Sequence, residues 1–88
     1  MARMTNVEYQ ANICEELGIP AKDRERVMKH MWQYIRLIDN ASAKRDTVSI
    51  AHTWQIMMAE ADRDVQFAKL MVDVQDHPQY WVKMRRNG

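Results

Sequence analysis

The clearest pattern in the chain is an apolar stripe along the stretch from Asp46 to Asp76, which contains neither Pro nor Gly. Small and apolar residues recur there at alternating spacings of three and four, as they do on one face of a helix. One row of the stripe is Ala51, Met58, Val65 and Val72, the other is Trp54, Ala61 and Ala68, and Ile50, Met57 and Met71 widen it. We therefore predict one long helix over 47–76, with this stripe against the core of the protein.

The second half of this predicted helix carries another apolar row on the opposite side. It consists of Phe67, Leu70 and Val74, and only the short apolar tail Tyr80, Trp81 and Met84 is available nearby to cover it. Apolar area left uncovered would be the kind of patch that marks an interface. We expect a partner-binding surface here, made by Phe67, Leu70, Val74, Tyr80 and Trp81 with the basic residues Lys83, Arg85 and Arg86.

The basic end of the chain has two interpretations. Trp81, Lys83, Arg85 and Arg86 form an aromatic and basic segment that could contact a nucleic-acid backbone, an acidic protein or a membrane surface. Cations near the C-terminus of a helix are also favourable by themselves, with no partner.

Helix-end signals divide the remaining chain. Thr5 and Glu8 fit a capping box, and Gly18 is suited to the left-handed position after a helix. Pro20 suits the first position of a second helix, and Pro78 disfavours continuation of the long helix.

The second helix has an inward stripe of Val27, Met31, Tyr34 and Ile38, flanked by Met28 and Ile35. The polar segment 40–46 separates it from the long helix, whose N-cap could be Asp46, Thr47 or Ser49.

Length and composition favour a single helical domain. The chain has 88 residues, of which 47% are hydrophobic and 28% charged, so it can fold around one modest core. Only two Gly and two Pro are present, too few for the turns of an all-β fold. We predict one all-α domain over 1–88, a small bundle of three main helices (5–17, 20–41 and 47–76) with a short C-terminal helix over 78–86.

Charge and cysteine content limit the location and the partners. The net charge of +1 produces no overall field for nucleic acid or anionic membrane. The lone Cys14 is expected in the core, since it cannot form an internal disulfide. We find no signal peptide and no apolar run long enough to span a membrane, and we expect a cytoplasmic protein.

Candidate catalytic residues are scattered. His30, His52 and His77 lie in different segments, and no catalytic or phosphate-binding motif is present. The acidic group Glu60, Asp62 and Asp64 is divided by helical geometry, because Asp62 points away from the other two. We therefore expect no enzyme activity, metal or cofactor; a small enzyme assembled from the His residues, Cys14 and the carboxylates is the least favoured class.

One segment offers a nucleic-acid alternative. The run Ile13–Val27 resembles the turn of a helix-turn-helix, with Gly18 at the turn, although Arg24 occupies a position that is usually apolar. In that case Lys22, Arg24 and Arg26 would contact bases or phosphates, and binding should be weak and non-specific. A helix that simply stops at a Gly explains the same run.

The leading functional expectation is a non-enzymatic helical interaction or regulatory protein. It would act by binding a protein partner or a second copy of itself, with a homodimer favoured. The alternative is a DNA-binding regulator that uses residues 13–27.

Overall fold

The chain forms four α-helices and a final 3-10 turn in the computed structural model, which describes residues 6–82. The elements are α1 (Asn6–Glu16), α2 (Ala21–Ala43), α3 (Thr47–Arg63), α4 (Val65–Asp76) and the 3-10 turn η1 (Pro78–Tyr80). No strand occurs in this range, and the all-α prediction is confirmed. None of the helices over 6–82 is both long and apolar enough to cross a membrane.

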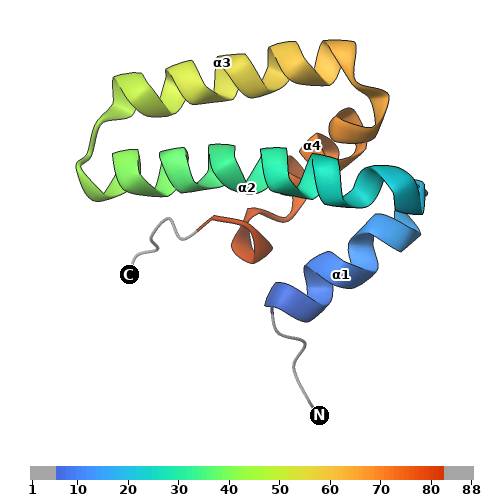
Figure 1. Ribbon diagram of the computed structural model, residues 1–88. Coiled ribbons are helices and arrows are strands. Elements are labelled where there is room, and N and C mark those ends of the chain that lie inside the picture. Colours follow the sequence, from blue (N-terminus) through green and yellow to red (C-terminus); the bar gives the residue numbers. More distant parts are fainter. Residues whose placement is uncertain (1–5, 83–88) are drawn as a thin grey trace.

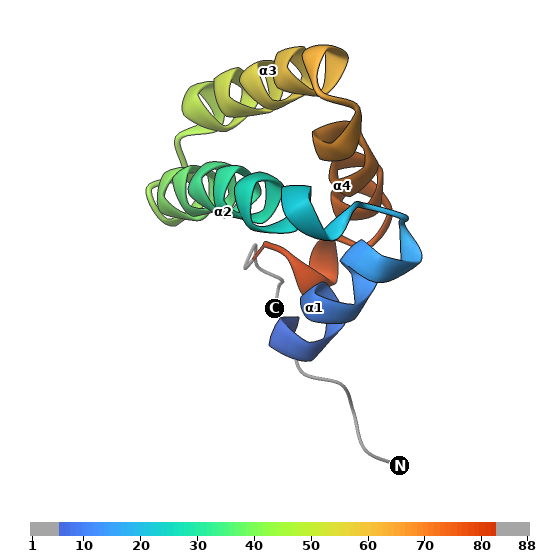
Figure 2. The same ribbon diagram turned by 45° about the vertical axis from the view of Figure 1, so that its right-hand side comes forward.

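The helices form a flat assembly (Figure 1). α2 and α3 run antiparallel and side by side, while α4 leaves the far end of α3 and crosses α2 (Figures 1 and 2). The principal extents are 39 × 35 × 18 Å. The assembly is therefore about half as thick as it is long or wide.

Gly18 ends α1 as predicted. Its φ of 77° lies in the left-handed region, and it donates through its N–H to Glu15 O at 3.1 Å. The Ile19 N–H donates to Cys14 O at 3.0 Å, which completes a Schellman motif. These two bonds pair the carbonyls of Glu15 and Cys14 at the end of α1.

The turn between α2 and α3 repeats this motif with an unfavourable residue. Arg45 has a φ of 57°, and its N–H donates to Ser42 O at 3.0 Å. The Asp46 N–H donates to Ala41 O at 2.9 Å. Asp46 is also the N-cap of α3, because its carboxylate accepts from the Ser49 N–H at 3.1 Å.

The core is formed mainly by α2 and α4. Val27, Met31, Ile35 and Ile38 on α2 are fully buried, which agrees with the predicted stripe except that Tyr34 is only half-buried. Cys14 is buried in the core as expected. The remaining core positions are Ile13, Ile19, Met57, Phe67, Leu70, Met71, Val74 and Trp81.

The prediction of one helix over 47–76 is wrong, because the chain breaks at Asp64. Its backbone is extended, with φ −135° and ψ 102°, between the last residue of α3 and the first of α4. Its carboxylate accepts from the N–H groups of Gln66 at 3.1 Å and Phe67 at 3.2 Å. Asp64 thus caps a new helix that runs in a different direction.

Because of this break, the apolar face predicted to be exposed is buried, and part of the face predicted to be buried is exposed. Phe67, Leu70 and Val74, expected to remain uncovered, are fully buried in the core because the turn at Asp64 directs that side of α4 toward α2. Part of the stripe that was predicted to face the core is instead exposed to solvent. Met58 is 54% exposed, Val65 is 69% exposed and Val72 is 55% exposed, and Ala51 is exposed as well. The second row, Trp54, Ala61 and Ala68, is half-buried.

The predicted short C-terminal helix is only partly described. Pro78–Tyr80 forms one 3-10 turn, and Trp81 then lies in the core, 2% exposed. The rest of the predicted 78–86 helix beyond Val82 lies outside the described residues, as do Thr5 of the predicted capping box and Met84.

Candidate interaction surface

A buried carboxylate joins both ends of the chain. Asp73 on α4, 6% exposed, accepts hydrogen bonds from the Tyr9 hydroxyl at 2.8 Å and from Trp81 Nε1 at 2.8 Å. Tyr9 also stacks on Tyr80, with ring centroids 3.9 Å apart. Burial, followed by the hydrogen bond to Asp73, raises the pKa of the Tyr9 phenol. The Tyr9 hydroxyl and the Trp81 indole N–H both donate to Asp73, so this cluster holds α1 and η1 against α4.

A second polar cluster ties α2 to α3. Glu60 accepts from the Tyr34 hydroxyl at 2.6 Å, and its other oxygen lies 2.7 Å from His30 Nδ1. The hydrogen bond to Glu60, assisted by burial, raises the pKa of Tyr34 to about 12. Arg26 similarly pairs with Asp64 at the helix break. The two like charges of Glu60 and Asp64 therefore each have a partner within the chain.

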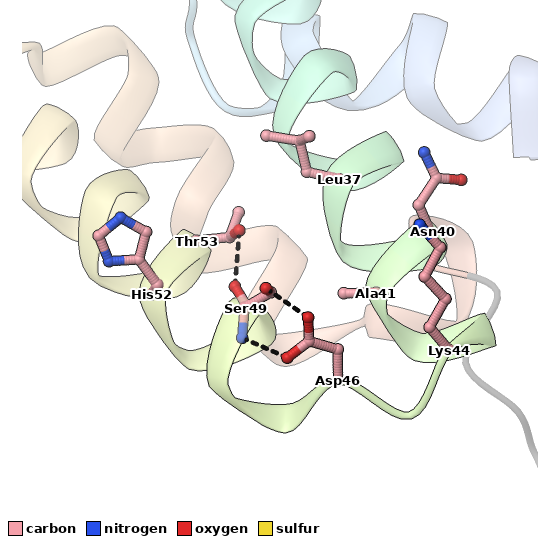
Figure 3. A pocket seen from close by; sticks show the side chains of 8 residues that line it. All are labelled: Leu37, Asn40, Ala41, Lys44, Asp46, Ser49, His52 and Thr53. Atoms are coloured by element: carbon pink, nitrogen blue, oxygen red, sulfur yellow. Dashed lines mark hydrogen bonds between the residues drawn. The ribbon is translucent and has the colours of Figure 1, made fainter.

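An open pocket of about 340 Å³ lies between the C-terminal half of α2 and the start of α3 (Figure 3). Asp46, Ser49 and His52 are among the residues that line it. Asp, Ser and His are the residue types of a catalytic triad. Ser49 Oγ, however, donates to the Asp46 carboxylate at 2.7 Å, and Figure 3 shows the His52 ring directed away from both. The arrangement is that of a helix cap, without a base placed to activate the serine.

The surface that differs most from an ordinary solvated helix is on α3. Between Thr47 and Ala59 the sequence contains no Asp, Glu, Lys or Arg, although most of these residues are exposed. We define the outer α3 face as Thr47, Val48, Ala51, Gln55 and Met58. The first four of these, with His52, line one shallow depression. Val48 is 77% and Met58 54% exposed, so apolar side chains project from this face.

The exposed side of α2 provides a contrast within the same molecule. Its exposed residues include Lys22, Glu25, Arg26, Lys29 and Arg36, so charged side chains accompany its exposed apolar residues, Trp32 and Leu37. The centres of protein interfaces are depleted of charged residues. The outer α3 face therefore has the composition of an interface rather than that of a solvated helix.

The predicted partner-binding residues that fall within 6–82 do not form an exposed surface. Phe67, Leu70, Val74 and Trp81 are core residues, and Tyr80 is half-buried beside Tyr9. Lys83, Arg85 and Arg86 lie outside the described residues.

The candidate DNA-contacting residues are mostly engaged within the chain. Arg24 Nε donates to Ile19 O at 3.0 Å, and Arg26 pairs with Asp23 at 3.4 Å as well as with Asp64. Lys22 is exposed. Two of these three cations therefore already have partners inside the chain.

The groups proposed for the least favoured class, an enzyme, lie apart. Within residues 6–82 no three His, Cys, Asp or Glu side chains are placed to share a metal ion. Cys14 is buried, and burial raises the pKa of its thiol, which disfavours the reactive thiolate. His30 is bonded to Glu60, whereas His52 and His77 are exposed on other segments.

Sequence reasoning missed the outer α3 face because periodicity alone assigned Ala51 and Met58 to the core. The available signal was the absence of charge. A helix face meant for solvent normally carries charged residues, and 47–59 carries none.

No protein-family model, curated protein or solved structure matches this chain.

Proposed function

We propose that this protein is a non-enzymatic helical interaction protein that binds a protein partner through the outer α3 face. The observation that carries the proposal is the combination of exposure and lack of charge over three to four turns of α3. Exposing apolar surface to water costs free energy, and covering that surface with a partner lowers the free energy of the system.

The scaffold around the face supports this role. α3 is held from its inner side by Met57, which is fully buried, and by the bonds of Glu60 to α2. Asp46 and Asp64 fix its two ends, one as the N-cap of α3 and one as the cap of the next helix. A face held on a rigid element loses little conformational freedom on binding, which favours affinity.

The test is affinity capture of the tagged full-length chain from its native host, with and without nuclease. We expect a protein, which can be an endogenous copy of the same chain, to remain bound after nuclease treatment. Met58→Lys should abolish this capture, because it places an unpaired charge within the contact.

Val72→Lys is the matched control. Val72 is 55% exposed on α4 and Met58 is 54% exposed on α3, so both changes add the same charge at equal exposure. Capture that is insensitive to Met58→Lys would contradict the proposal. Capture that nuclease removes would favour the nucleic-acid alternative instead.

A further inference from the structure

We infer that the partner is a second copy of this chain, and that the two outer α3 faces pair antiparallel about a two-fold axis near Trp54 and Gln55. This inference rests on the proposed function and adds the identity and geometry of the partner. In a two-fold contact each residue i of one copy meets residue j of the other, and j meets i. The face must therefore be complementary to itself.

The side chains of the face meet that requirement. Ala51 and Met58 are seven residues apart and lie on the same side of α3. The midpoint between them falls between Trp54 and Gln55, so antiparallel pairing about that point places Met58 of each copy over Ala51 of the other. A large flexible side chain then fills the space left by a small one at two equivalent places.

Only one of the two apolar rows in the seven-residue pattern of α3 is covered within a single chain. Trp54 and Ala61 pack against the core, whereas Ala51 and Met58, from the adjacent row, are exposed. Two rows at alternating spacings of three and four are typical of a helix that packs along a seam. One row is covered by this chain, and a second α3 would cover the other.

Charge at the helix ends favours the antiparallel orientation. Lys44 and Arg45 precede α3, and Asp62 lies in its last turn; the ion pairs seen over residues 6–82 involve none of the three. Antiparallel pairing brings Lys44 and Arg45 of each copy near Asp62 of the other, and Asp46 near Arg63, the basic residue of that last turn. Parallel pairing would place like charges together, which opposes association.

The size of the contact sets the expected strength. Residues 47–62 span about 24 Å at 1.5 Å per residue, and the contact is one helix wide. This is at the small end of protein interfaces, so we expect a dimer that dissociates on dilution rather than a permanent one.

The first test is sedimentation equilibrium on the purified full-length chain over a wide concentration range. We expect a monomer–dimer equilibrium for the wild-type chain and for Val72→Lys. Met58→Lys alone and Ala51→Glu alone should each raise the dimer dissociation constant by roughly tenfold or more. Circular dichroism should show unchanged helix content in every variant, because all three substituted positions are exposed.

The decisive variant is the double substitution Ala51→Glu with Met58→Lys. In the antiparallel register each Glu faces a Lys of the other copy at two places, so association should recover relative to either single variant. In a parallel register Glu would face Glu and Lys would face Lys, and the double variant should be the weakest of all.

Three outcomes would overturn the inference. They are a wild-type chain that stays monomeric at every concentration, a dimer unaffected by Met58→Lys, and a double variant that associates less than both single variants. A monomeric chain that still captures a different protein in a Met58-dependent manner would leave the proposed function intact and remove only the second copy as partner.

Discussion

Trp81 Nε1 donates a hydrogen bond to the Asp73 carboxylate at 2.8 Å, and both residues are nearly inaccessible to water. A buried carboxylate is costly unless it is paired or hydrogen-bonded. Here Trp81 and the Tyr9 hydroxyl supply the donors, from segments at opposite ends of the chain. This relationship gives α1 and η1 a defined position on α4, the helix that contributes most to the core beside α2.

We expect Asp73→Ala to destabilise the protein by about 2–4 kcal/mol, because the buried Trp81 donor and the partly buried Tyr9 donor lose their acceptor, and each unsatisfied buried donor costs about 1–3 kcal/mol. Urea denaturation followed by circular dichroism measures this change. Asp76→Ala, an exposed acid on the same helix, is the control and should change stability by less than about 0.5 kcal/mol. Equal urea midpoints for the two variants would contradict the role given to Asp73.

We expect Arg45→Gly to stabilise the protein by about 1 kcal/mol, since a left-handed residue other than Gly carries a steric cost of about 1–2 kcal/mol. Arg45 has a φ of 57°, whereas Lys44 before it has a φ of −95°. Lys44→Gly should therefore destabilise. Thermal unfolding at a concentration that keeps the chain monomeric compares the two. A lower unfolding temperature for Arg45→Gly would show that the turn does not impose this strain.

Helix ends could be predicted from the sequence wherever a residue imposes the local geometry. Gly18 permits a positive φ, Pro20 and Pro78 restrict the backbone, and Asp46 caps a helix after a polar turn. Asp64 lies among residues that all accept helical geometry. Its break depends on distant groups, because Arg26 pairs with its carboxylate and burial of Phe67 orients the next helix.

Periodicity alone could not predict which of the two apolar faces is buried. The row with Ala51 and Met58 and the row with Phe67 and Leu70 are both apolar, and a pattern does not state which of them another helix covers. The turn at Asp64 makes that choice by rotating α4 relative to α3. Because this rotation buries the apolar row of α4, the candidate binding surface is the outer α3 face instead of that row.

We expect the unfolding temperature to decrease below about pH 4, and Asp64→Asn to make that decrease shallower. The hydrogen bond from Arg26 holds the pKa of the Asp64 carboxyl below its ordinary value. A lowered folded-state pKa adds stability at pH values above the unfolded pKa, about 3.9, and this contribution is lost as the pH falls through the folded value. Asn keeps a capping side chain, so the fold should persist.

Thermal scans from neutral pH to pH 2 test the effect. The pKa of Asp46 is also lowered, by its bonds from Ser49, so part of the acid dependence should remain in Asp64→Asn. Wild-type and variant profiles that run parallel through the acid range would rule out the contribution of Asp64.

We expect Tyr34→Phe to remove a late-titrating phenol. The hydrogen bond to Glu60 raises the pKa of Tyr34 to about 12. A raised folded-state pKa adds stability below the unfolded value, about 10, and that stability is lost as the pH rises through the folded value. Phenolate absorbance during an alkaline titration should lose its component near pH 12 in the variant. Retention of that component would assign it to another tyrosine, of which Tyr9 is the leading candidate because its pKa is also raised.

The last prediction concerns the reversed faces, and it separates the observed fold from the one expected from the sequence pattern. Phe67 is fully buried, so Phe67→Ala should destabilise the chain by about 3–5 kcal/mol through lost contacts and a cavity. Met58 is 54% exposed, so Met58→Ala should cost less than about 0.5 kcal/mol in the monomer. If α3 and α4 formed one helix with the Met58 stripe inside, the order would be the opposite. Urea denaturation of both variants at low protein concentration measures it directly, and a larger loss for Met58→Ala would contradict the break at Asp64.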